Sequence, residues 1–310
     1  MTAQNKKKIK PAVILILLVL LFLAVFFYFQ SNNKDKINTE LLRDKDGKII
    51  ISAASFPVYD FAKEVGGDKT NVSLLLPPGL ESHSFKPTDK ELAKMASSSI
   101  VFYTLSLAEP WASELAKASS IKTRFVATAD GLAEGDDPHV WLDFTKASLM
   151  VDKITETYQA LDAVNYNYYQ AQAEVYKKKL QDLDGLYSSS LQNCQFRDLV
   201  QGGHQAFAYL ARRYNLNYLP SQGPEPKIEL DMVRMTAQIK QLKESGQGYV
   251  YYEELIMPSL AEVIRQQTGA KMVLLNAAHN VARYDIEGGL NFIKIMENNL
   301  QALKLGLRCQ

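Results

Sequence analysis

The side chains best suited to chemistry in this 310-residue chain are its four histidines. They are His83, His139, His204 and His279, separated by 56, 65 and 75 residues, so each belongs to a different structural unit. Imidazole is the commonest protein ligand for borderline metals such as zinc. A single histidine at a turn is more typical of a surface or cap residue. The joint pattern, with all four at turns or at the mouths of predicted elements, indicates convergence on one metal ion.

Strand and helix patterns alternate on either side of a long helical segment. Before it, strands are predicted at residues 48–55, 72–76 and 100–103, with helices after the first strand and at 89–96. After it, strands are predicted at 198–201, 249–252 and 272–275, and helices at 205–214, 230–244, 259–268 and 290–305. Such alternation with short connections is typical of α/β layers.

The long segment, residues 144–191, has no strand pattern, and its apolar and aromatic residues recur at helical spacing. Its second half could form a helix of about 27 residues, roughly 40 Å long. The sequence therefore predicts two α/β lobes, each a mostly parallel sheet flanked by helices, joined by one long rigid helix. We assign residues 48–164 to the N-terminal lobe, 165–192 to the linking helix and 193–310 to the C-terminal lobe.

Three of the histidines follow predicted strands, which is where open α/β sheets bind ligands. His83 and His279 lie after strands, His204 follows Gly202 and Gly203 at the end of another, and His139 lies just ahead of the long helical segment. His204 also opens the predicted helix 205–214. The positive end of that helix dipole would favour a neutral ring, which is the form that binds metal.

The N-terminus has the pattern of a membrane segment. Residues 12–29 form an uninterrupted apolar run of 18, preceded by four lysines. A secretory core usually has about 7–15 apolar residues, and a spanning helix needs roughly 17–25. We therefore expect residues 1–30 to be an uncleaved anchor and residues 31–47 a tether. The lysines place the rest of the chain on the extracytoplasmic face. If the segment is cleaved instead, the chain is secreted or periplasmic.

The net charge of the chain restricts the class of partner. Subtracting the four N-terminal lysines from the net charge of +1 leaves about −3 for the rest, which offers nucleic acid no electrostatic attraction.

Cys194 and Cys309 are the two cysteines. An oxidising compartment would let them pair in a disulfide that holds the extreme C-terminus. The alternative is two free buried thiols.

Several segments resemble a known family, the metal-binding substrate-binding proteins (cluster A-I) of bacterial ABC importers for zinc and manganese. The resemblance covers nearly all of the chain after the predicted anchor. The segments that carry it are FPVYDFAKEVGGDK (56–69), LLPPGLESHSFKPTDKEL (75–92), DDPHVWLDFTKA (136–147), HQAFAYLARRYNL (204–216), VYYEELIMPSLAEVIRQQTGAK (250–271) and MENNLQALKLGL (296–307).

The resemblance implies three metal ligands, His83 and His139 from the N-terminal lobe and His204 from the C-terminal lobe. Family members for manganese tend to carry a carboxylate at the third position, so His204 favours Zn²⁺, and Mn²⁺ is the alternative cargo. Imidazole also suits zinc, whereas carboxylates and water suit manganese.

The fourth ligand departs from the family pattern. Many relatives have an aspartate where this chain has Asn276, and a neutral amide is a poor zinc ligand. His279, three residues on, is the candidate that replaces it, and water is the alternative. Glu253 has two possible roles: it orients a ligand histidine, or it pairs with an arginine such as Arg283.

The resemblance implies a monomeric binding protein, not an enzyme, that delivers its metal to an ABC permease and its ATPase. Two other classes remain to be weighed. A zinc hydrolase needs a general base beside an open coordination position, and the sequence has no HExxH motif. A surface adhesion protein could use the same scaffold with the metal as a structural element.

Overall fold

The computed structural model describes residues 41–80, 82, 84–118, 123–224, 231–253, 259–279 and 281–310. The predicted anchor and most of the predicted tether lie outside these ranges, as does His83. Among the helices that the structure does describe, none is long and apolar enough to cross a membrane.

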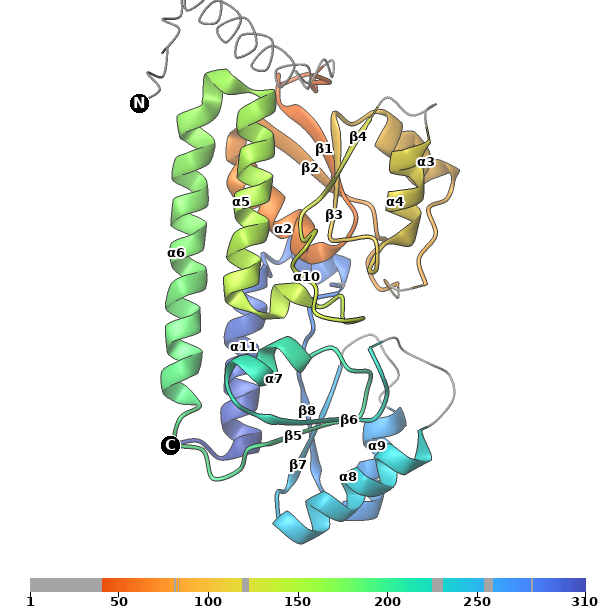
Figure 1. The fold of residues 1–310 in the computed structure, drawn as a ribbon, viewed down its shortest axis with the longest axis vertical. Helices are drawn as coiled ribbons and strands as arrows, with labels where there is room; N and C mark the ends of the chain where they lie inside the picture. Colours follow the sequence, from red (N-terminus) through yellow and green to blue (C-terminus); the bar gives the residue numbers. More distant parts are fainter. Residues whose placement is uncertain are drawn as a thin grey trace, which may run out of the picture. The chain divides into compact units, whose positions relative to one another are not determined.

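The N-terminal lobe is built on a parallel sheet with strand order β2-β1-β3-β4 (Figure 1). Its strands are β1 (Ile49–Ala53), β2 (Thr70–Leu74), β3 (Ile100–Tyr103) and β4 (Arg124–Ala127). Helices α2 (Phe56–Gly66) and α5 (Phe144–Leu161) lie on one side of the sheet, and α3 (Asp89–Ala96) and α4 (Pro110–Lys117) lie on the other. Ile51 and Phe102 of the two central strands are fully buried, as expected for strands covered on both faces.

The described end of the predicted tether packs along this lobe. The backbone N–H of Ile50 donates to the carbonyl of Leu42 at 2.9 Å, and the N–H of Leu42 donates to the hydroxyl of Ser99 at 2.8 Å. These bonds place residues 41–47 beside β1.

The C-terminal lobe repeats the arrangement with strand order β6-β5-β7-β8, again all parallel. Its strands are β5 (Asp198–Gln201), β6 (Asn217–Pro220), β7 (Tyr249–Tyr252) and β8 (Lys271–Leu274). Its helices include α7 (Ala208–Arg213), α8 (Met232–Ser245) and α9 (Ser259–Thr268). The prediction of two α/β lobes with parallel sheets is confirmed.

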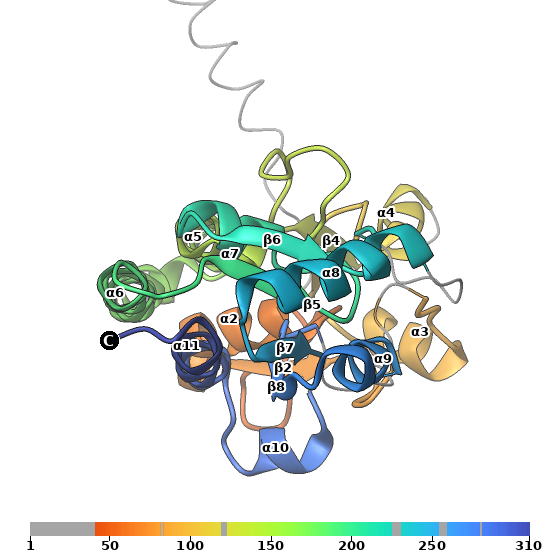
Figure 2. The same ribbon diagram turned by 90° about the horizontal axis from the view of Figure 1, so that it is seen from below.

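The predicted linking helix is present as α6 (Tyr166–Ser190), with 25 residues. A second helix, α11 (Phe292–Leu307), runs beside α6 and also reaches both lobes (Figures 1 and 2). The N–H of Phe292 donates to the carboxylate of Asp60 in the N-terminal lobe at 3.2 Å. At the other end, the carbonyl of Leu307 accepts from the N–H of Phe196, just ahead of β5, at 3.0 Å.

The chain therefore passes between the lobes more than once. After β8 it enters a loop that contacts the N-terminal lobe and contains the short helix α10 (Arg283–Glu287), and α11 then returns. A disulfide joins Cys194 to Cys309, and so fastens the chain after α6 to the chain after α11.

Candidate metal centre

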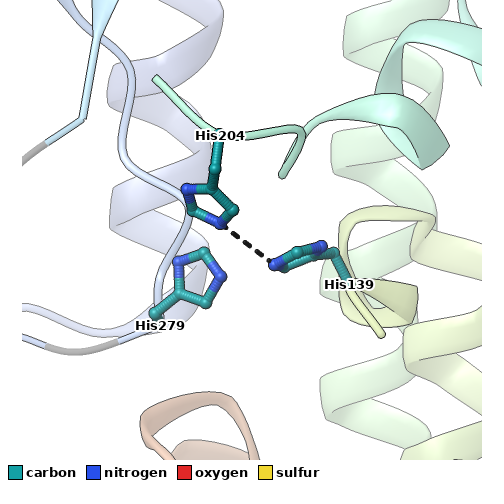
Figure 3. A group of neighbouring side chains, drawn as sticks. All are labelled: His139, His204 and His279. Atoms are coloured by element: carbon teal, nitrogen blue, oxygen red, sulfur yellow. Dashed lines mark hydrogen bonds between the residues drawn. The ribbon is translucent and has the colours of Figure 1, made fainter. Parts of the chain in front are cut away.

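Three of the four histidines meet between the lobes (Figure 3). The ring centroids of His139 and His204 are 5.2 Å apart, and that of His279 lies 4.6 Å from the first and 5.0 Å from the second. Each ring offers one nitrogen within 4.8 Å of the nitrogens of the others. His83, the remaining predicted ligand, lies outside the described residues.

His139 is held by a carboxylate two residues earlier in the chain. Its ring is fully buried, and its Nδ1 lies 2.7 Å from Oδ1 of Asp137. The same carboxylate oxygen accepts the backbone N–H of His139 at 3.0 Å. An ionised carboxylate can only accept hydrogen bonds, so this contact favours the proton on Nδ1 and leaves the lone pair of Nε2 for a ligand.

His204 has an equivalent partner in the other lobe. Its Nδ1 lies 3.0 Å from Oε2 of Glu253, which follows β7, and both side chains are almost fully buried. The other oxygen of Glu253 accepts from the amide of Gln201 at 2.6 Å. A Cβ atom at Gly203 would lie 2.4 Å from that second oxygen, so the glycine leaves room for the carboxylate. Glu253 thus lies beside the ring of His204, which is the contact that the first of the two roles considered from sequence requires.

The helix-dipole argument for His204 was wrong. Helix α7 begins at Ala208, not at residue 205. The intervening residues follow a separate path, in which the N–H of Gln205 donates to the carbonyl of Gly223 at 2.8 Å. The ring of His204 therefore lies beside the carboxylate of Glu253 and not at the end of a helix.

His279 lies on a loop that Asn276 shapes. The side-chain oxygen of Asn276 accepts the N–H of Ala278 at 2.7 Å, and Ala278 has a positive φ of 58°. The N–H of Asn276 donates to the side chain of Asn299 on α11 at 2.8 Å. The hydrogen bond from Ala278 to the Asn276 side chain stabilises this turn. It offsets the strain of a left-handed backbone conformation, which residues other than glycine rarely adopt.

Trp141 attaches this loop to the N-terminal lobe. Its indole N–H donates to the carbonyl of Ala277 at 2.8 Å, and it lies edge-on to both His139 and His279, at centroid distances of 5.4 and 5.5 Å. The indole is 3 % exposed, so it shields one side of the histidine cluster from water. Neither Trp141 nor Asp137 was identified from sequence. For Asp137 the available signal was an acidic side chain two residues before a candidate ligand.

The Nε2 atoms of His139 and His204 face each other at 3.3 Å. In a tetrahedral zinc site, with Zn–N bonds of about 2.0–2.1 Å, two ligand nitrogens lie about 3.3–3.4 Å apart. When the proton of each ring is on Nδ1, both Nε2 atoms carry their lone pair toward the space between the rings, and a cation bound there relieves the repulsion. The cluster is therefore suited to bind one divalent metal ion between the lobes.

Several known proteins are similar to this chain in sequence. The zinc-binding lipoprotein AdcA of Streptococcus pneumoniae is 32% identical over 281 residues, which cover 84% of this chain and 56% of that protein. The chain therefore spans about half the length of this relative. The high-affinity zinc uptake system protein ZnuA of Bacillus subtilis is 30% identical over 281 residues, which cover 84% of this chain and 88% of that protein.

Solved structures share the fold. The Zn(II)-bound ZnuA-like domain of Streptococcus pneumoniae AdcA superimposes with a TM-score of 0.73 at 31% identity, over 84% of this chain and 99% of that one. The laminin-binding protein Lmb of Streptococcus agalactiae, described as bifunctional with adhesin and metal-transporting activity, gives 0.76 at 25% identity, over 83% and 99%. Residues 51–306 match the family described as "ZnuA: Zinc-uptake complex component A periplasmic". The chain belongs to the ZnuA family.

Proposed function

We propose that this chain is an extracytoplasmic solute-binding protein that captures Zn²⁺ and delivers it to an ABC permease and its ATPase. The observation that carries the proposal is the 3.3 Å separation of the Nε2 atoms of His139 and His204, each with a carboxylate behind its ring. An all-imidazole set favours zinc over manganese, which prefers oxygen ligands. Mn²⁺ remains the alternative cargo.

Capture depends on ligands from both lobes. His139 belongs to the N-terminal lobe, whereas His204 and His279 follow strands of the C-terminal lobe. With His83 as a further ligand, as the family resemblance implies, the metal would join two imidazoles from each lobe. Because α6 and α11 both span the lobes, loading would reorder the ligand loops and shift one lobe slightly instead of opening a wide hinge.

Transport explains the carboxylates better than hydrolysis does. The carboxylates of Asp137 and Glu253 both lie against the Nδ1 side of an imidazole. A hydrolase would need a base that faces a metal-bound water on the Nε2 side. These two carboxylates orient ligands, which suits a protein that binds and releases a metal unchanged.

The location and partners complete the proposal. Relatives named as lipoproteins and zinc-uptake components support an extracytoplasmic location and an ABC transporter as partner. An anchor at residues 12–29 would hold the loaded monomer near its permease and raise the effective concentration.

The proposal is tested by calorimetry of the purified full-length chain with zinc and with manganese. Zinc should bind more tightly, and H204A should lose most of the affinity while it keeps its circular dichroism spectrum. Lowering the pH from 7.5 to 5 should weaken zinc binding by about tenfold or more, because protons compete for the imidazoles. Unchanged affinity in H204A, or at pH 5, would contradict imidazole ligation.

A second candidate function is surface adhesion, which the structural similarity to Lmb favours. Binding of the purified chain to immobilised laminin, with and without zinc, tests it. Binding that requires zinc would support an adhesin role in which the metal holds the lobes together.

A further inference from the structure

One tyrosine of the C-terminal lobe holds the turn that precedes His139 in the other lobe. The hydroxyl of Tyr209, on α7, accepts the N–H of Glu134 at 2.7 Å and donates to the carbonyl of Asp137 at 3.1 Å. Glu134 and Asp137 also form an isolated antiparallel bridge with each other. A single hydroxyl therefore contacts both ends of this four-residue turn across the boundary between the lobes.

Charged side chains on either lobe hold the tyrosine ring in place. The ammonium of Lys146 lies 5.5 Å from the ring centroid, and the guanidinium of Arg212 lies 4.8 Å from it. Both cations also pair with the carboxylate of Glu134, at 2.9 and 3.1 Å. That carboxylate is half-exposed, so these ion pairs contribute little. Tyr209 is 2 % exposed, and its hydroxyl is the buried link.

The turn held by Tyr209 is the one that orients a proposed metal ligand. The side chain of Asp137 accepts from both the backbone N–H and the Nδ1 of His139, while its carbonyl accepts from Tyr209. The contacts thus run without a break from α7 to the His139 ring. Separation of the lobes would break the tyrosine contacts and free the turn.

We propose that Tyr209 is a positioning residue that slows metal release. From the C-terminal lobe it holds Asp137, and through Asp137 it keeps the Nε2 of His139 aimed at the shared site while the lobes are together. The inference rests on the proposed function, because it takes His139 as a ligand. The metal can reach the site before the Tyr209 contact forms, but this contact must break before the metal leaves. Loss of the contact therefore changes the dissociation rate.

The test compares Y209F with Y158F in the full-length chain. Tyr158 is a matched control: it is fully buried, and its hydroxyl donates to the carbonyl of Ala62 at 3.1 Å, but both residues belong to the N-terminal lobe. Zinc release into excess chelator should be about fivefold faster or more in Y209F, because the variant loses both hydrogen bonds of the buried hydroxyl. Association should stay within about twofold of wild type, and Y158F should release zinc as wild type does.

Cobalt(II) gives a second readout, because its visible absorption reports the ligand geometry. The spectrum of the Co²⁺ complex should change in Y209F and not in Y158F. A double variant H139A/Y209F should release metal no faster than H139A alone, since the tyrosine acts through that ring.

Three results would overturn the inference: a wild-type release rate in Y209F, a faster rate shared by Y158F, or additive effects in the double variant. Failure of the wild-type chain to bind zinc would instead refute the proposed function. The two failures are therefore distinguishable in one set of measurements.

Discussion

Oε2 of Glu253 lies 3.0 Å from Nδ1 of His204, and the two side chains are only 3 and 1 % exposed. The N-terminal lobe has its own version of this pair in Asp137 and His139. Each lobe thus presents an imidazole with a carboxylate oxygen against its far nitrogen. The two proposed ligands are oriented before a metal arrives, which reduces the cost of ordering them on binding.

Replacing Glu253 by glutamine should weaken zinc binding by about 10- to 100-fold. The amide keeps the size of the side chain but removes the charge that favours the Nδ1 proton of His204. Calorimetry at pH 7.5 measures the change. The control is E262Q, which alters an exposed carboxylate paired with Arg265 on α9 and should leave affinity unchanged. Equal affinity in E253Q and wild type would rule out the orienting role.

The loop of His279 provides a paired test at Asn276. N276A removes the oxygen that accepts the N–H of Ala278, so we expect a displaced His279 and a several-fold loss of zinc affinity. N276D keeps an oxygen at that position and should retain the loop. If both variants bind zinc equally to wild type, either the turn does not depend on this side chain or His279 does not contribute to binding.

All four central strands of the two sheets that the structure describes, but only two of their four edge strands, were predicted from the sequence. The buried strands β1, β3 and β7 have apolar residues on both faces, so their patterns are continuous. Strands β4 and β6 were missed, whereas β2 and β8, the other two edge strands, were predicted. Arg124 begins one and Pro220 ends the other, and both residues weaken a strand pattern.

The site shows the same division between local and long-range information. The scarcity of histidine and its position at the ends of predicted elements indicated a convergence of rings, and the structure brings His139, His204 and His279 together. Tyr209 and Trp141 could not be predicted in the same way. Their contacts depend on how the lobes pack and not on any local spacing. The path of α11 across both lobes was missed for this reason as well.

The disulfide should stabilise the fold without affecting the metal. It closes a loop with a sequence separation of 115 residues between Cys194 and Cys309. The loop-entropy relation gives about 4–5 kcal/mol for such a loop. Urea unfolding of C194S/C309S should show a loss of this size, while zinc affinity stays within about twofold of wild type. An unchanged unfolding midpoint would mean that the bond contributes no net stability.

Stability should fall as the pH rises through the titration of Glu109. Burial raises the pKa of this carboxyl from 4.5 to about 7, although hydrogen bonds from Ser55 and Thr104 oppose the shift. Between pH 4.5 and about 7, Glu109 is protonated in the folded state but largely ionised in the unfolded chain. The free energy of unfolding therefore decreases as the pH rises through this range. From pH 5 to 8 the decrease attributable to this group is roughly 2–3 kcal/mol.

Urea unfolding of metal-free wild type and E109Q at both pH values measures this decrease. The variant lacks the ionisable group, so its stability should fall less between pH 5 and 8. Asp60, whose pKa burial raises to about 6, changes in the same direction but is present in both proteins and cancels in the comparison. Parallel pH profiles would show that Glu109 ionises normally in the folded state.

The ring of Phe292, at the start of α11, packs edge-on against Phe61 and Phe144 in the core of the N-terminal lobe. A ribosome makes residues 48–164 long before it reaches this phenylalanine. The lobe that is synthesised first therefore lacks part of its interior until almost the whole polypeptide has been made. Nascent chains, and fragments truncated before residue 292, should be unable to complete that lobe.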